Sequence, residues 1–189
     1  MEAEYEGFSR FEPMSSPSEG SESARLMYLL AIASAARSVR IASAYFVPDN
    51  LSVRTLVDAR RRGVKVVIIV PSEHNDSGVT RRAVRSRWGL LLQAGAEIYE
   101  YRPTMYHCKV MIVDDCWTTI GSANFDNRSF RLNDEANLNV YDADFGREQV
   151  GAFEHDQKRS CRITLEEWTN HPWTEKLKDR AAGLLRSQL

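Results

Sequence analysis

The segment that constrains the fold most is residues 64–70, which read VKVVIIV and are β-branched at every position except Lys65. β-Branched residues favour strands, and a nearly unbroken apolar run is typical of a central strand that is buried on both faces. Gly63 follows a helical pattern over residues 51–62 and stands where the glycine that ends a helix belongs. We therefore expect a helix followed by a central strand, the unit from which α/β domains are built.

The rest of the sequence alternates in the same way, between helical periodicity and short strand-like runs. Helices are expected at residues 24–37, 51–62 and 79–94, and strands at residues 39–47, 64–70, 97–101, 109–115, 117–122 and 135–141. The two strands at 109–115 and 117–122 should form a hairpin, and the remainder after residue 141 reads as helical, with Thr164 and Glu167 as a capping box. This order predicts an α/β fold, namely an α/β/α layered sandwich with a mixed central sheet.

The chain of 189 residues is long enough for one such domain. Residues 1–21 are poor in apolar residues and rich in Ser, Glu, Pro and Gly, so we expect a linker or a disordered N-terminal segment there. Residues 22–189 are expected to form the domain.

Overall composition excludes several classes of protein. The net charge is −1, so no whole-molecule field attracts the chain to nucleic acid or anionic lipid, and any attraction to phosphate must be local. No apolar run approaches the roughly 20 residues that span a bilayer, and the acidic N-terminus does not resemble a signal peptide. The cysteines are odd in number and form no CxxC pair, which argues against a disulfide framework or a zinc site.

The stretch that carries chemistry begins at His107 and Lys109. Side chains alternate in an extended strand, so these two should point the same way and Cys108 the other way. An ammonium holds an anion and a neutral imidazole can attack it, so this pair predicts a phosphate site.

The predicted hairpin then returns Gly121, Ser122 and Asn124 to the same end of the sheet. Gly121 permits close approach of the backbone, while Ser122 and Asn124 offer neutral donors for phosphoryl oxygens. Glu135 can orient the histidine through its second ring nitrogen, as a carboxylate does in hydrolytic triads.

These residues resemble the HKD signature of the phospholipase D superfamily, with His107-x-Lys109-x4-Asp114-x6-Gly121-Ser122-x-Asn124 present without a gap. The resemblance extends over about residues 20–160, where the sequence is similar to the C-terminal half of bacterial cardiolipin synthases. The similar stretches are SARLMYLLAIASAARSVRIASAYFVPD, GVKVVIIVPSEHND, GAEIYEY, MYHCKVMIVDD and GSANFDNRSFRLNDEANL. The resemblance implies one phospholipase D-like half-domain within residues 22–189.

The resemblance also implies roles for the residues of the signature. The catalytic set is His107, Lys109, Asp114 and Glu135: His107 forms a phosphohistidine or acts as the acid and base opposite one, and Glu135 orients it. Lys109, Ser122 and Asn124 bind the substrate phosphate. Four residues separate Lys109 from Asp114 along the strand, so we expect Asp114 to be structural rather than catalytic. No metal or other cofactor is expected.

Three further residues are candidates for the rim of the site. His74 lies in the loop after the central strand, where α/β sheets place ligand contacts, although a solvated loop residue is an equally good interpretation. Asp126 and Arg128 follow Asn124 closely, and the resemblance to the family suggests that they shape the rim, although a cap and an ion pair are an alternative interpretation.

The departure from the family is the number of motifs. Family enzymes use two HKD histidines, and this sequence contains one HxK. A second half must therefore come from elsewhere, either from an N-terminal part of a parent protein or from a second copy of the chain.

Three hypotheses remain open. The first is a phosphatidyltransferase that makes cardiolipin from phosphatidylglycerol through a phosphohistidine. The second is a homodimeric single-HKD phosphodiesterase or nuclease, against which the lack of a basic stripe counts. The third is a catalytically incomplete half-domain. For the first we expect phospholipid as the substrate, no nucleic acid partner, and peripheral contact with the cytoplasmic side of the cell membrane.

Overall fold

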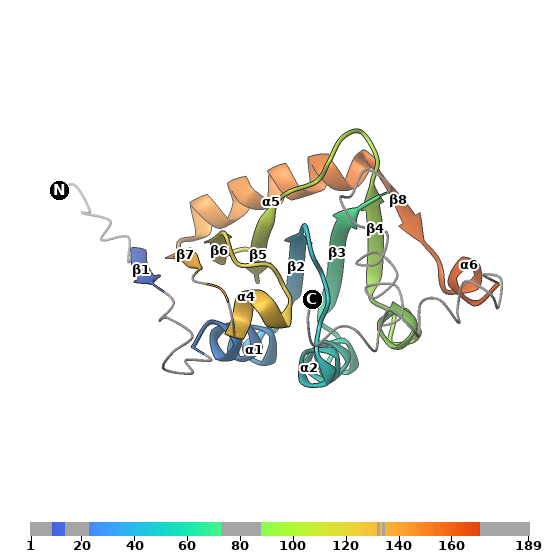
Figure 1. Ribbon diagram of the computed structural model, residues 1–189, viewed down its shortest axis with the longest axis horizontal. Helices are drawn as coiled ribbons and strands as arrows, with labels where there is room; N and C mark the ends of the chain where they lie inside the picture. The colour runs from blue at the N-terminus through green and yellow to red at the C-terminus, as the bar shows by residue number, and fades with distance from the viewer. Residues whose placement is uncertain (1–8, 14–22, 73–87, 132, 134, 171–189) are drawn as a thin grey trace.

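The computed structural model describes residues 9–13, 23–72, 88–131, 133 and 135–170. Their centre is an eight-stranded sheet with the order β1-β7-β6-β5-β2-β3-β4-β8 (Figure 1). The strands are β1 (Ser9–Pro13), β2 (Ser38–Ser43), β3 (Lys65–Pro71), β4 (Glu97–Tyr101), β5 (Lys109–Val113), β6 (Trp117–Gly121), β7 (Ala136–Tyr141) and β8 (Ser160–Ile163). Strand β3 pairs in parallel with β2 and β4, and the other neighbouring strands are antiparallel, so the predicted mixed sheet is confirmed.

Helices cover both faces of the sheet. The described helices are α1 (Ser23–Ser34), α2 (Asn50–Arg61), α4 (Asn127–Arg131), α5 (Ala143–Lys158) and α6 (Leu165–Thr169), and residues 88–93 are also helical. Helix α5 crosses one face, whereas α1 and α2 lie against the other (Figure 1). This is the α/β/α layering that the sequence predicted. No described helix is both long and apolar enough to cross a membrane.

Strand β3 shows why the apolar run at residues 64–70 is central. Val66, Ile68 and Val70 belong to the core beneath α1 and α2, while Val67 and Ile69 belong to the core beneath α5. Each of these side chains is at most 2% exposed. The strand therefore has no polar face, as expected for the middle of a layered sheet.

Several elements differ from the sequence prediction. Residues 9–13, inside the segment expected as a linker, form β1 and pair with β7. Residues 160–163, expected to be helical, form β8 at the other edge, because they pair with β4. The strand expected at 39–47 ends at Ser43, and the helix expected at 24–37 ends at Ser34. Of the helix expected at 79–94, residues 88–94 are described, and residues 88–93 are helical.

Two predictions that depend only on residues close in sequence, a hairpin and a capping box, are confirmed. Strands β5 and β6 form the predicted hairpin. The capping box is present, since Thr164 Oγ1 accepts the Glu167 N–H at 3.1 Å and Glu167 Oε2 accepts the Thr164 N–H at 2.9 Å. It begins α6, the short helix that follows β8.

Candidate active site

The ends of four strands meet at one edge of the sheet. Antiparallel pairing places Ser43, at the end of β2, opposite Lys109, at the start of β5. It also places Gly121, at the end of β6, opposite Asn137, near the start of β7. Residues far apart in sequence, from Ser43 to Glu135, are thereby assembled at this edge, which carries most of the predicted site.

The side chains of His107 and Lys109 contact each other, while Cys108 packs against the core beneath α5. Lys109 Nζ lies 3.1 Å from His107 Nδ1 and 3.2 Å from its Nε2. The ammonium nitrogen thus lies almost equally far from the two ring nitrogens, and it also donates to the His107 carbonyl oxygen at 3.1 Å. His107 is exposed and Lys109 is half-buried.

Burial lowers the pKa of the Lys109 ammonium, and nearby negative charges, including those of Glu135 and Asp126, act in the opposite direction. These carboxylates favour the charged form that holds a phosphate. Lys109 is therefore placed to bind an anion while it contacts the candidate nucleophile.

Gly121 allows β7 to approach the loop that follows β6. An ideal Cβ on Gly121 would lie 2.1 Å from the Ala136 carbonyl oxygen and 2.2 Å from Asn137 Oδ1. In the space that glycine leaves, Ser122 pairs with Ala136 twice, since its N–H donates to the Ala136 carbonyl and its Oγ accepts the Ala136 N–H, both at 3.0 Å. The Ser122 hydroxyl thus keeps its own proton to donate to a phosphate.

Asn124 is held from two sides. Its Oδ1 accepts the N–H of Tyr45 at 3.2 Å, and its own N–H donates to Ser129 Oγ at 3.1 Å. With the amide oxygen occupied, the NH₂ group is the end left to donate to a phosphoryl oxygen, the role the sequence predicted.

Asn137 is a supporting residue that the sequence analysis missed. It is 2% exposed, and its Oδ1 accepts the Ala123 N–H at 3.2 Å. Its Nδ2 donates to the Tyr28 hydroxyl at 2.9 Å and to Thr119 Oγ1 at 3.0 Å. The loop that carries Ser122 and Asn124 is therefore tied to β6, β7 and α1. The only sequence signal was a polar residue at a strand position that faces the core.

Glu135 lies at this edge but does not make the expected contact. Its Oε1 accepts from Asn133 Nδ2 at 3.2 Å, whereas the ring of His107 has Lys109 as its partner among the described residues. The charge of Glu135 acts on Lys109 and on Asp126. Orientation of His107 by Glu135 therefore stays a prediction.

Asp126, one of the three rim candidates, is buried at 6% exposed. Its Oδ1 accepts the Ser129 N–H at 2.8 Å, which caps α4. Burial, with a smaller contribution from Glu135, raises the pKa of its carboxyl to about 6, against hydrogen bonds from Ser129 and Arg128. Arg128 lies exposed on α4, and His74 lies outside the described residues.

Asp114 lies at the opposite end of β5, in the turn of the hairpin. Its carboxylate accepts the N–H groups of Ala36, Arg37 and Ser38 at 2.7–2.8 Å. Burial of the group acts to raise its pKa, but these bonds more than offset that and leave the pKa below its usual value. The structure thus places Asp114 apart from the other residues of the signature, in the structural role that its spacing predicted.

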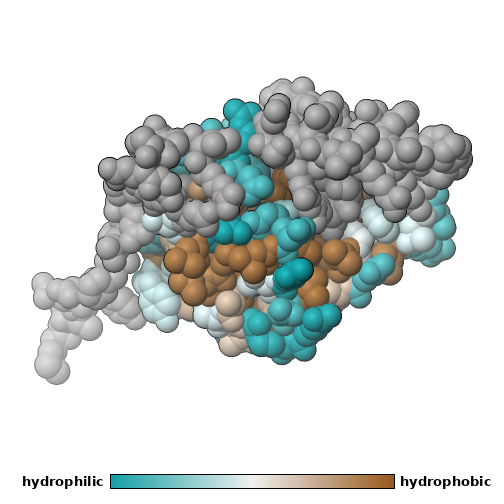
Figure 2. All heavy atoms as spheres, turned by 60° about the horizontal axis from the view of Figure 1, so that its bottom comes forward, coloured by the Kyte–Doolittle hydropathy of each residue, from teal (hydrophilic) through white to brown (hydrophobic). Residues whose placement is uncertain are grey.

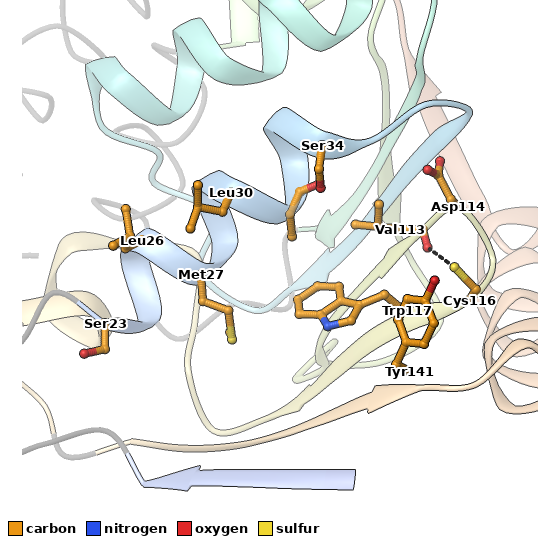
Figure 3. A pocket seen from close by; sticks show the side chains of 11 residues that line it. Ser23, Leu26, Met27, Leu30, Ser34, Val113, Asp114, Cys116, Trp117 and Tyr141 are labelled. Atoms are coloured by element: carbon orange, nitrogen blue, oxygen red, sulfur yellow. Dashed lines mark hydrogen bonds between the residues drawn. The ribbon is translucent and has the colours of Figure 1, made fainter. Parts of the chain in front are cut away.

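An apolar cavity lies away from His107 and Lys109. It has a volume of about 710 Å³ and lies between α1 and the β5–β6 turn (Figure 3). Its walls include Met27, Leu30, Trp117 and Tyr141. On the face that carries α1 and α2, apolar side chains gather in a patch with hydrophilic neighbours (Figure 2). Leu26, Leu30 and Leu51 of these helices are 48–59% exposed.

No group of three or more His, Cys, Asp or Glu residues within the described ranges could hold a metal ion. The polar groups expected at the site are instead one imidazole, one ammonium, one hydroxyl and one amide. This set suits a tetrahedral oxyanion.

The family model "Cardiolipin synthase, PLD-like domain" matches residues 28–157, which include His107, Lys109, Asn124 and Glu135. The chain belongs to this family. It is 36% identical to the minor cardiolipin synthase ClsB of Bacillus subtilis over 150 residues, covering 79% of this chain and 37% of that protein. It is also 36% identical to cardiolipin synthase 2 of Staphylococcus epidermidis over 171 residues, covering 90% of this chain and 35% of that protein. The chain thus spans about a third of the length of these relatives.

Solved structures share the fold of this phospholipase D-like domain. The phospholipase D family member Nuc from Salmonella typhimurium superposes with a TM-score of 0.69 at 23% identity, covering 84% of this chain and 99% of that one. Phosphatidylserine synthase of Haemophilus influenzae superposes with a TM-score of 0.76 at 16% identity, covering 97% of this chain and 47% of that one. The same fold therefore occurs as a whole chain in one protein and as about half of a chain in another.

Proposed function

We propose that this chain supplies one half of a phosphatidyltransferase site that makes cardiolipin from two molecules of phosphatidylglycerol. The observation that carries the proposal is the contact of His107 with Lys109 beside Ser122 and Asn124, in a domain of the cardiolipin synthase family. An imidazole beside an ammonium, a hydroxyl and an amide suits attack on a phosphodiester.

The chemistry proceeds in two transfers. A ring nitrogen of His107 forms a bond to phosphorus, and the bond from phosphorus to the glycerol oxygen breaks, while a general acid protonates the leaving alkoxide. The hydroxyl of a second phosphatidylglycerol then loses its proton to a base, bonds to phosphorus and releases the imidazole. Lys109, Ser122 and Asn124 bind the phosphoryl oxygens in both steps, and Glu135 orients His107.

The general acid opposite His107 is a second HKD histidine. The sequence has one HxK, and general acid help is typically worth about 10²–10⁴-fold in rate. The partner half is either an N-terminal part of a longer protein or a second copy of this chain. Because the substrates are lipids, we place the domain peripherally at the cytoplasmic side of the cell membrane, with the apolar patch of α1 and α2 available for contact.

The first test is turnover of labelled phosphatidylglycerol by this chain in EDTA over a range of protein concentrations. Cardiolipin formation that rises faster than linearly with protein means that two copies complete the site. His107→Ala should abolish the product, and retention of full activity in that variant would refute the proposal. Product only after an N-terminal HKD half is added would identify a divided enzyme.

A homodimeric phosphodiesterase is the second candidate, favoured by the match of this domain to 99% of the Nuc chain. In that case two identical chains would pair their motifs across a two-fold axis. DNA cleavage in EDTA that disappears in His107→Ala, without cardiolipin formation, would favour it.

A further inference from the structure

A buried carboxylate is linked to the residues that we assign to the phosphate. Asp126 is 6% exposed and caps α4 through the Ser129 N–H. Capping requires only a side-chain oxygen, which Ser, Thr or Asn supplies without a charge. The helix cap alone therefore does not account for an ionisable group at this buried position.

Two links join Asp126 to the phosphate-binding residues. The Ser129 side chain hydrogen-bonds to the Asp126 carboxylate, and Ser129 Oγ also accepts the N–H of Asn124 at 3.1 Å. In addition, the charge of Asp126 acts on the Lys109 ammonium. The carboxylate is thus coupled to Asn124 through one serine and to Lys109 through space.

The charged groups around Asp126 determine how the protonation of its carboxyl responds when an anion binds nearby. The charge of Asp126 acts on Lys109 of β5, the charge of Glu135 before β7 acts on Asp126, and the N–H groups of Arg128 and Ser129 of α4 donate to its carboxylate. Burial, followed by the hydrogen bonds and the like charge of Glu135, leaves the pKa of Asp126 at about 6. A phosphate group at Lys109 and Asn124 adds another negative charge nearby, which favours the neutral acid further.

We propose that Asp126 is a positioning residue of this site and that its carboxylate takes up a proton when a phosphate group binds at Lys109 and Asn124. The proton comes from solvent and forms an O–H bond on the carboxylate, and no bond of the phosphate changes. One negative charge is thereby removed from beside the anion, while a carboxyl oxygen still accepts the Ser129 N–H. The inference depends on the proposed function only for the place of the phosphate.

The test uses sulfate, a tetrahedral oxyanion whose charge is constant over the neutral range. Calorimetric titration in buffers of different ionisation enthalpy measures the protons taken up for each sulfate bound. His107 can also take up a proton, so the decisive protein is His107→Gln. This variant should still take up protons near pH 6.5, and its sulfate affinity should rise as the pH falls, by at most about tenfold per pH unit for one linked proton.

Asp126→Asn in the His107→Gln background should abolish the uptake and make the affinity independent of pH. The fold should survive, because Asn caps a helix as well as Asp does. Asp142→Asn is the matched control: Asp142 caps α5 by accepting the Phe145 N–H at 2.8 Å, but it follows the end of β7 away from the site. It should leave the uptake unchanged.

Uptake that persists in Asp126→Asn would overturn the inference and reduce Asp126 to a helix cap. Failure of the wild-type chain to bind sulfate at any pH would overturn it too, since no anion would then reach the carboxylate. Failure of the proposed function has a different signature, namely proton-linked sulfate binding without any cardiolipin.

Discussion

Asp126 carries an ionisable group at a position from which solvent is nearly excluded. Its pKa is raised from an ordinary 3.8 to about 6, mainly by burial. The folded state therefore favours the protonated acid. Its contribution to the free energy of unfolding is fully present below pH 4 and is lost as the pH rises through 6. A shift of this size corresponds to about 3 kcal/mol.

Asp126→Asn should remove this dependence, because the amide does not titrate. The difference in unfolding free energy between the wild-type chain and the variant should change by about 2–3 kcal/mol between pH 4 and pH 7.5, with the wild type losing stability at the higher pH. Urea denaturation at a series of pH values measures it, with Asp142→Asn as the control. Parallel pH profiles for wild type and Asp126→Asn would contradict the assignment.

A second prediction concerns the effect of Glu135 on the pKa of the Asp126 carboxyl. Its negative charge raises the pKa of Asp126, so Glu135→Gln should lower that pKa below 6. A ¹³C NMR titration of the Asp126 carboxyl measures the midpoint directly. Glu154→Gln, on α5 near Arg40, is the control and should leave the midpoint in place. An unchanged midpoint in Glu135→Gln would show that the two carboxylates do not interact.

The placement of some of these residues could be expected from sequence and that of others could not, for a physical reason. His107, Lys109, Ser122 and Asn124 follow from strand alternation and a hairpin, which are properties of neighbouring residues. The role of Asn137 depends on contacts with Tyr28 and Ala123, which only the folded chain brings together.

Among the elements, the turn from β6 into the phosphate-binding loop depends on Gly121. An added Cβ would meet Ala136 and Asn137 at 2.1–2.2 Å, both too close for β7 to remain in place. Gly121→Ala should therefore destabilise the chain by about 1–3 kcal/mol and weaken sulfate binding. Gly151→Ala is the matched control, because a Cβ on this α5 glycine has no atom within 4 Å and should add about 0.5–1 kcal/mol of stability. Equal behaviour of the two variants in urea denaturation would contradict the prediction.

The β5–β6 turn depends on Asp114, which adopts a φ of 53° and accepts three backbone N–H groups at the end of α1 and the start of β2. Asp114→Asn tolerates this backbone conformation but exchanges an acceptor for a donor. It should cost about 1–3 kcal/mol in unfolding free energy while the sulfate affinity of the folded protein stays unchanged. A large loss of affinity with normal stability would instead place Asp114 in the site.

The central elements could be predicted from sequence because their own residues determine them. Strand β3 is β-branched almost throughout, and the capping box at Thr164 needs only residues three apart. The edge strands β1 and β8 were missed because they are short and become strands by pairing with β7 and β4. Such pairing is a tertiary effect that local propensity does not carry.

At the scale of the whole molecule, the site presents one candidate histidine nucleophile in a chain that spans about a third of its curated relatives. If two copies complete the site, both must contribute His107. Mixing wild-type chain with His107→Ala in equal amounts then leaves only about one quarter of the dimers with two histidines. Transferase activity at constant total protein should fall to that fraction rather than to one half.

The mixing curve separates the two sources of the second half. A quadratic dependence on the wild-type fraction means that identical chains pair, whereas a linear dependence means that each chain works with a different partner or alone. Asp142→Asn mixed in the same proportions should leave the activity unchanged, since this residue only caps α5. A linear curve in the presence of an added N-terminal half would show that the second histidine comes from that half, with each copy of this domain contributing His107 independently.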